Sequence, residues 1–265
     1  MPFPLAHPAA VLPLVRRPFV ASALVAGAVA PDLLYVGPLY QIATQYIHGN
    51  LTLTLTHKVT SALWLDPLLA LLLLLVFHFA LRRPLVALAP RGLAARLPEP
   101  SRAPVLWTVV SVVAGAFTHV IWDAFTHWDG YFVRRFPGFF GAEVTAGWEV
   151  SRVLQYVSTL GGCLVLAVWL HRWYRRTSPS AVTSGVPAWV RYFVLGLAVA
   201  FAAVSVAVEL GRVDGAFAGE TAVRLVLSGL VSGALIVLVG YVLVWHLIRW
   251  RRRWWVRRDA TDGAA

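Results

Sequence analysis

Residues 117–130 read Phe-Thr-His-Val-Ile-Trp-Asp-Ala-Phe-Thr-His-Trp-Asp-Gly and close a long apolar run that begins at Val105. The run from Val105 to Thr126 has the length that a helix needs to cross hydrocarbon. His119 and Asp123 are four residues apart, so they share one face of that helix. Ionisable groups in a membrane segment are costly unless they are paired, bind a cation or face water. The stretch therefore predicts a membrane helix that carries a functional site.

The composition extends this prediction to the whole chain. Of its 265 residues, 59% are hydrophobic and 13% are charged, whereas soluble domains have roughly 45–50% and about 25%. The mean hydropathy of +0.71 arises from uninterrupted runs such as residues 68–77. We expect an all-α, polytopic membrane bundle with about five or six transmembrane helices and no soluble domain beside it. The only cysteine is Cys163, which excludes an intramolecular disulfide and a cysteine-based zinc framework.

The apolar runs set the expected spans. Five of them are clear: residues 61–81, 105–126, 153–170, 192–210 and 223–248. Residues 5–36 are interrupted by Arg16-Arg17-Pro18, and Pro18 disfavours helix at the residue before it. This first segment is either one span or a helical hairpin, and only the hairpin lets His7 and Asp32 reach one site easily.

The same pattern divides the chain into three parts. Residues 1–172 are expected to form a membrane core with the metal site, residues 173–190 a cytoplasmic linker rich in Ser and Pro, and residues 191–265 two additional spans with a basic tail. The Trp-rich tail from Arg249 to Arg258 is typical of an interface anchor.

The positive charge of the chain fits membrane topology better than nucleic acid. The net charge is +11, but the arginines cluster between apolar runs and no nucleic-acid motif is present, so no nucleic-acid partner is expected. Placing both termini and the loops 82–102 and 172–191 on one side gathers seventeen of the 23 Lys and Arg residues there. By the positive-inside rule that side is cytoplasmic, which predicts an inner-membrane protein with cytoplasmic termini. With a hairpin, only the N-terminus moves, and Arg16 and Arg17 become a local exception.

This topology directs a set of polar residues toward the outer leaflet, namely Asp32, His48, His57, His119, Asp123 and His127. An H-x-x-x-D pair suits zinc or manganese, because imidazole and carboxylate both bind such cations. With Asp32 and His57 there are four candidate ligands, and His7 makes a fifth, enough for two metals that share Asp123. Alternatives remain open: His119 and Asp123 as a buried polar clasp, Asp32 as a helix N-cap, and His57 as an interfacial residue.

Other polar residues rank second. His48 and His127 are more often loop histidines than ligands. Arg134 and Arg135 could bind an anionic substrate, although solvated loop arginines are commoner. Asp66 lies about half a turn round from His57 on a helix and is not a simple co-ligand.

Several motifs together resemble a bacterial multi-pass membrane family, the domain of unknown function 4184 (DUF4184). The resemblance covers roughly residues 1–172 and rests on these stretches: Met1-Pro2-Phe3 to His7-Pro8-Ala9-Ala10, Ala30-Pro31-Asp32, His57, Phe77-His78, Arg82-Arg83-Pro84-Leu85, and His119 to Asp129 with Gly130. Two positions depart from the family pattern. Lys58 replaces the usual Thr after His57, and Gln155-Tyr156-Val157-Ser158 lacks the His of a Gln-His-x-Ser pattern.

More remotely, the order of His, Pro-Asp, His and H-x-x-x-D is similar to inner-membrane metal-dependent hydrolases and to helical zinc-dependent phospholipases C. This resemblance implies a zinc ion held by Asp32, His57, His119 and Asp123, and a second ion that His7 and Asp123 help to hold. It also implies metal-assisted hydrolysis of a phosphoester, with Asp32 as the base and a phospholipid or lipid-linked phosphate at the outer leaflet as substrate. A metal-binding scaffold without catalysis and a transporter are the competing hypotheses.

Overall fold

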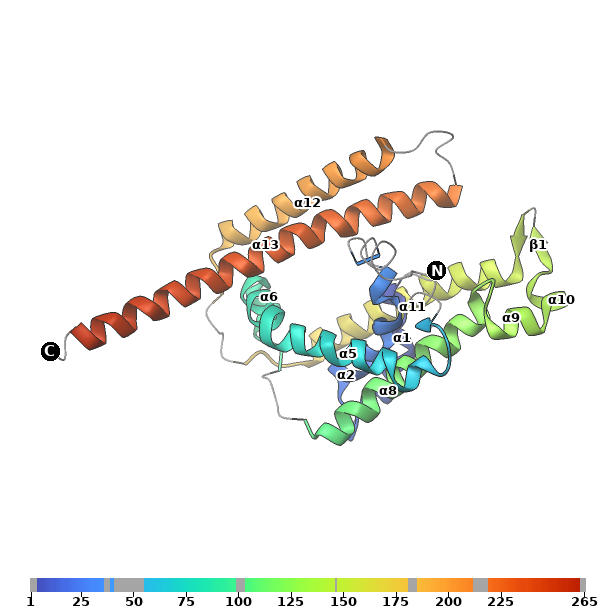
Figure 1. Cartoon of the computed structure of the whole chain (residues 1–265), viewed down its shortest axis with the longest axis horizontal. Helices are drawn as coiled ribbons and strands as arrows, with labels where there is room; N and C mark the ends of the chain where they lie inside the picture. The colour runs from blue at the N-terminus through green and yellow to red at the C-terminus, as the bar shows by residue number, and fades with distance from the viewer. Residues whose placement is uncertain are drawn as a thin grey trace. The chain divides into compact units, whose positions relative to one another are not determined.

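The computed structural model describes residues 4–35, 39–40, 55–98, 103–145, 147–180, 185–211 and 219–262. His48 lies outside the described residues. The chain divides into two compact units. The first unit contains residues 1–35, 39–77 and 98–180, and the second contains residues 36–38, 78–97 and 181–265. Figure 1 shows the chain coloured by residue number.

The expected all-α polytopic fold is confirmed. Among the described residues, five helical segments are long and apolar enough to cross a membrane: Leu65–Leu88, Val105–Arg135, Val150–Arg176, Ala188–Gly211 and Leu225–Arg251. The first unit is built mainly from α2 (Ala21–Val29), α5 (Leu65–Val76), α8 (Val105–Thr126) and α11 (Val150–Arg176).

The opening segment folds as a helical hairpin and not as a single span. Its first arm has a 3-10 turn at Pro4–Ala6, the short helix α1 (Pro8–Val11) and a 3-10 turn at Leu12–Leu14. Its second arm is α2, which continues as a 3-10 helix over Ala30–Tyr35.

The tip of the hairpin reaches the start of α8. The Phe19 and Trp107 rings are 5.9 Å apart, and the N–H of Val20 donates to the Ser111 hydroxyl at 2.9 Å. Arg16 and Arg17 therefore lie near the end of α8 that follows the basic loop 82–102. For a hairpin, the sequence analysis expected Arg16 and Arg17 to be an exception to the positive-inside rule. Their position at the hairpin tip means that they are not an exception.

Helices α2 and α8 pack with their backbones in contact. A Cβ on Gly27 would overlap the Val112 carbonyl, and one on Gly115 would overlap the Leu24 carbonyl. The surrounding core is also made of small side chains, including Ala23, Ala26 and Ala116. Small residues allow membrane helices to approach closely, and dispersion forces and polar contacts then hold them together.

After α8 the chain leaves the long helices and forms a short aromatic region. It contains α9 (Tyr131–Arg135), α10 (Pro137–Phe140) and an antiparallel pair of strands, β1 (Glu143–Thr145) and β2 (Trp148–Glu149). Phe132 of α9 stacks on Phe125 of α8 at 4.1 Å between ring centroids. Gly147 turns between the strands with φ of +75°, a conformation that favours glycine.

The second unit contains α6 (Arg82–Leu88), α7 (Arg91–Ala94), α12 (Ala188–Gly211) and α13 (Gly219–Asp262). Helices α12 and α13 lie side by side and run in opposite directions (Figure 1). Gly229 and Gly233 make this approach possible, because a Cβ on either would overlap the backbone of Val206 or of Phe201 and Ala202.

Helix α13 also completes the hydrogen bonding of α6. Pro84 has no N–H, so it cannot bond to the Ala80 carbonyl one turn earlier, and His246 Nε2 lies 2.9 Å from that carbonyl oxygen. The Tyr241 hydroxyl donates to the Pro84 carbonyl at 2.9 Å. From α12, Arg191 donates to the carbonyls at the end of α6 at 2.7 and 2.9 Å. These bonds satisfy backbone groups that hydrocarbon would leave unpaired.

Candidate metal centre

Four side chains from three segments of the chain bring one donor atom each to a common point in the first unit. They are Asp32, His57, His119 and Asp123, and their donor atoms all lie within 4.8 Å of one another. His57 Nε2 is 3.4 Å from Asp32 Oδ1 and 3.3 Å from Asp123 Oδ2. His119 Nε2 is 3.7 Å from the same Asp32 oxygen and 3.1 Å from the same Asp123 oxygen. We call this set of atoms the four-donor group.

One buried face of α8 both packs against the hairpin and carries two of the four donors. Ser111, Gly115, His119 and Asp123 follow one another at intervals of four residues and are all buried. Ser111 bonds to the hairpin tip, and Gly115 contacts α2 at Gly27. His119 and Asp123 follow on the same face and carry the donor atoms. Because residues four apart lie one above another on a helix, close packing lower on α8 sets the position of His119 above it.

The ring of His119 is fixed by a backbone carbonyl. Its Nδ1 lies 2.7 Å from the Ala28 carbonyl oxygen, which can only accept a hydrogen bond, so Nδ1 carries the proton. Nε2 then presents its lone pair to the four-donor group. A hydrogen bond of this kind from the second ring nitrogen is the usual way in which proteins orient a metal-binding histidine.

His57 is placed by a tight turn before α5. The Ser61 hydroxyl contacts the carbonyl oxygens of Leu55 and Lys58, and the Thr56 hydroxyl lies 3.1 Å from His57 Nδ1. The turn directs Nε2 of His57 to the carboxylates. Its side chain is 17% exposed, the most open of the group.

His7 meets the opposite oxygens of the same two carboxylates. Its Nε2 is 3.8 Å from Asp32 Oδ2 and 3.6 Å from Asp123 Oδ1. The His7 ring stacks on the His119 ring with centroids 3.8 Å apart. His7 is therefore not a further member of the four-donor group. Together with the second oxygens of Asp32 and Asp123, it forms a neighbouring set of three donors.

His7 is held in place by α11. A Cβ on Gly162 would lie 3.1 Å from both the Cβ and the carbonyl oxygen of Ala6, so the absence of a side chain there makes room for the first arm of the hairpin. Trp122 contacts the His7 ring edge-on at 5.9 Å and donates to the Ser158 hydroxyl at 3.2 Å. Ser158 of the altered Gln-x-x-Ser pattern thus supports the site indirectly.

His127 also joins the cluster, although its sequence position ranked it second. Its Nδ1 lies 3.2 Å from Asp123 Oδ2, with the side chain 13% exposed. His127 is four residues after Asp123, and its N–H donates to the Asp123 carbonyl at 3.0 Å, so helical spacing puts its ring beside Asp123. The ψ of 142° at His127 then turns the following chain out of the helix.

The donor atoms satisfy a basic test for a cation site. His7, Asp32, His119 and Asp123 are almost completely buried. Within the described part of the chain, both oxygens of each carboxylate and Nε2 of His7, His57 and His119 have no hydrogen-bond partner. Buried polar atoms are costly in this state. Zinc with bonds of 2.0–2.1 Å separates neighbouring tetrahedral ligands by about 3.3 Å, close to the 3.1–3.7 Å between the histidine nitrogens and the carboxylate oxygens.

The protonation of the two histidines outside the spans differs. Burial is the main cause that lowers the pKa of His7 to about 4, so its ring is neutral, as a metal ligand must be. Burial also acts to lower the pKa of His57, but interactions with the Asp123 and Asp32 carboxylates outweigh it and raise the pKa to about 10. A cation would have to displace the His57 proton.

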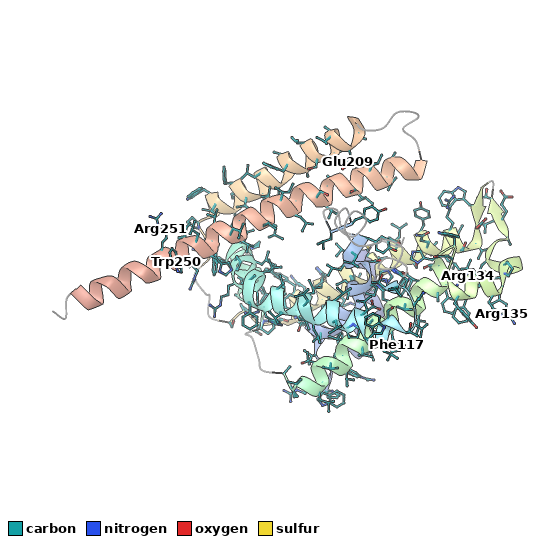
Figure 2. The ribbon with its side chains drawn as sticks, in the orientation of Figure 1. Phe117, Arg134, Arg135, Glu209, Trp250 and Arg251 are labelled. Carbon is teal, nitrogen blue, oxygen red and sulfur yellow. The ribbon has the colours of Figure 1, made fainter. Side chains whose placement is uncertain are left out.

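The remaining predicted residues lie apart from the donor atoms. Arg134 and Arg135 are exposed at the end of α9, where Figure 2 labels them, and the Arg135 guanidinium lies 5.6 Å from the Phe136 ring. Asp66 is buried at the start of α5 and is not part of the four-donor group.

The fold and the cluster define a multi-pass membrane protein with a buried His/Asp group that can hold a metal ion. The chain belongs to the family described as Domain of unknown function (DUF4184), which matches residues 1–244. The match confirms the family and continues past residue 172 through α12 and much of α13. No curated protein and no solved structure matches the chain.

Proposed function

We propose that this protein is a metal-dependent hydrolase that cleaves a phosphoester bond, with zinc as the metal. The observation that carries the proposal is the convergence of Asp32 Oδ1, His57 Nε2, His119 Nε2 and Asp123 Oδ2 without hydrogen bonds to one another. Two imidazoles and two carboxylates match the ligands that zinc takes in hydrolytic sites.

The chain offers donors for two ions. The four-donor group would hold the first ion. His7 and Asp123 Oδ1 would help to hold the second, so that Asp123 would be shared and Asp32 Oδ2 would stay free to act as a base. A pair of divalent ions lowers the pKa of a bound water and polarises the phosphoryl oxygens.

Asp32 is the residue we assign as the base. Its carboxylate lies between the two donor sets, near His57 and His119 on one side and His7 on the other. In this position it can orient a water molecule and accept its proton.

The open edge of the cluster indicates where a substrate would enter. His57 and His127 are its two partly exposed members. The next residues along the chain include Trp128 and Tyr131, which are 81% and 63% exposed. Exposed aromatic side chains of this kind are typical of a membrane interface, so a phospholipid or a lipid-linked phosphate is the substrate class we favour.

The charge pattern supports a proposed position of this edge at the outer leaflet of a cytoplasmic membrane. The basic loops 82–102 and 172–191 are at the opposite ends of the spans, and the positive-inside rule assigns them to the cytoplasm. Because the hairpin returns His7 to the cluster, the N-terminus would lie on the outer side and the C-terminal tail in the cytoplasm.

The second candidate function is a structural metal site without catalysis. It is favoured by the burial of the ligands, because structural zinc sites are closed by four protein ligands whereas catalytic sites keep one position open. His119 and Asp32 are no more than 1% exposed.

Elemental analysis of the purified full chain tests the metal, and turnover separates the two functions. We expect at least one transition metal per chain, lost in His119→Ala and Asp123→Ala and retained in the control His171→Ala, whose side chain lies exposed on α11. Less than one metal per chain, unchanged by the substitutions, would end both candidates. With metal bound, we expect hydrolysis within a panel of phosphodiester lipids, abolished in the same variants. If the metal-loaded protein cleaves none of these lipids, the metal site is structural.

A further inference from the structure

The second unit contains a large apolar cavity. Its volume is about 1120 Å³, and its walls are formed by α6, α12, α13 and residues 185–187. Side chains such as Phe193, Leu197 and Val244 make the lining predominantly apolar. Sites for drug-sized ligands occupy roughly 300–1,000 Å³, so this cavity has room for a longer molecule.

The charged residues that line the cavity are all positive. Arg82, Arg83 and Arg249 line it, and no Asp or Glu is among its lining residues. The Arg249 guanidinium is held 4.7 Å above the Trp245 ring, which keeps the charge near the apolar wall. Figure 2 labels Trp250 and Arg251 next to this part of α13 and labels Glu209 near the opposite end of α12. An anionic group is therefore favoured beside these arginines.

The apolar part of the cavity has the length of one lipid leaflet. On α12 the lining residues extend from Trp189 to Phe201, which corresponds to about 18 Å at 1.5 Å per residue. Half of the hydrocarbon core of a bilayer is about 15 Å. A free phosphate would use only the arginines and leave this apolar length uncovered.

We propose that the second unit binds one anionic phospholipid, with its phosphate at Arg82, Arg83 and Arg249 and its acyl chains along α12 and α13. Basic pockets between membrane helices on the cytoplasmic side are suited to such headgroups. This inference is independent of the proposed hydrolase, because every residue that carries it belongs to the second unit.

A glycine in the cavity wall allows a sharp test. Gly240 lines the cavity, and a Cβ there would meet nothing within 4 Å. Gly240→Phe would therefore fill the space for the acyl chains without displacing backbone. The matched control is Gly196→Phe on α12, where a Cβ also meets open space and which does not line the cavity.

Retention of lipid by the full chain in neutral detergent, measured by native mass spectrometry, gives the readout. Phosphatidylglycerol and phosphatidylcholine with the same acyl chains are offered separately. We expect one phosphatidylglycerol per chain, with at least fivefold higher retention than phosphatidylcholine. Arg82→Gln/Arg83→Gln/Arg249→Gln should remove the preference, and Gly240→Phe should reduce retention at least fivefold. Gly196→Phe and Arg172→Gln/Arg175→Gln/Arg176→Gln, on α11, should behave as wild type.

Four results would overturn the proposal. Equal retention of both lipids by the wild-type chain would remove the charge selectivity, and this measurement needs no variant. If the triple arginine control on α11 lost the preference for phosphatidylglycerol to the same extent, any basic surface of the protein would be enough to retain the lipid. Full displacement of the lipid by soluble glycerol phosphate, or normal retention by Gly240→Phe that elutes as a folded protein, would exclude the acyl-chain groove.

Discussion

Gly27 and Gly115 meet across the contact between α2 and α8, and a Cβ on Gly115 would lie 3.0 Å from the Cα of Gly27. One turn beyond this contact, His119 bonds to the Ala28 carbonyl. The approach of two backbones therefore determines where a ligand is held.

Substitution of Gly115 by Ala should loosen both the fold and the metal site. The added methyl overlaps the α2 backbone, and overpacking of this kind costs about 1–3 kcal/mol. We expect a lower melting temperature in detergent and a lower metal content. Gly161→Ala on α11 is the control, since a Cβ there meets open space and Ala favours helix by up to about 1 kcal/mol over Gly. Equal melting temperatures for the two variants would contradict the role assigned to the Gly27–Gly115 contact.

Ser111→Ala should destabilise the hairpin tip. The substitution leaves the Val20 N–H without its acceptor, which costs about 1–3 kcal/mol for a buried group. Thermal unfolding of the purified protein measures the effect. Thr108→Ala is a suitable comparison, because the exposed Thr108 hydroxyl bonds only within its own helix, and surface substitutions change stability by no more than about 0.5 kcal/mol. If Thr108→Ala lowered the thermal stability as much as Ser111→Ala, the role assigned to the Val20–Ser111 hydrogen bond would be contradicted.

His7→Ala should separate the two donor sets. It removes the only imidazole near Asp32 Oδ2 and Asp123 Oδ1 among the described contacts and leaves the four-donor group intact. We therefore expect the metal content to fall from two ions to one, whereas Asp123→Ala, which removes the carboxylate shared by both donor sets, should remove both. Elemental analysis under identical buffer conditions makes the comparison. If His7→Ala abolishes all metal, the two-set arrangement is incorrect.

Removal of metal by a chelator should lower the melting temperature of the wild-type chain. A ligand that binds the folded state stabilises it by RT ln(1 + [L]/Kd), about 2.7 kcal/mol at one hundred times Kd. The Asp123→Ala variant should melt at the same temperature with and without chelator, because it has lost the carboxylate shared by both donor sets. A chelator-induced shift that persists in this variant would place the metal elsewhere.

The sequence was informative where polar residues interrupt apolar runs. The membrane fold follows from the runs themselves, and His119 with Asp123 follows from helical spacing. Asp32 and His57 were candidates because they flank predicted spans, and the structure brings them to the same point. Such residues can be recognised in the sequence because an ionisable group in hydrocarbon is costly unless it is paired, binds a cation or faces water.

Other parts of the site depend on contacts that no local pattern encodes. The contact between Gly27 and Gly115 and the bond from Val20 to Ser111 join residues far apart in sequence. His127 was ranked low because a histidine of this kind is more often a loop residue than a ligand, whereas its place four residues after Asp123 brings the two side chains together. The hairpin was one of two open alternatives, since Pro18 disfavours helix before it without specifying the direction of the chain that follows.

The spread of the cluster along the chain has a consequence for biosynthesis. His7 is made almost at once, but its carboxylate neighbour Asp123 emerges only after the long apolar helix Leu65–Leu88 and more than half of the next one, Val105–Arg135, have been translated. During that interval the hairpin has no α8 to pack against, and its histidine and aspartate cannot yet form the cluster. On the proposed function, metal loading is thus a late event that can begin only once the third apolar segment has entered the bilayer and docked on the first.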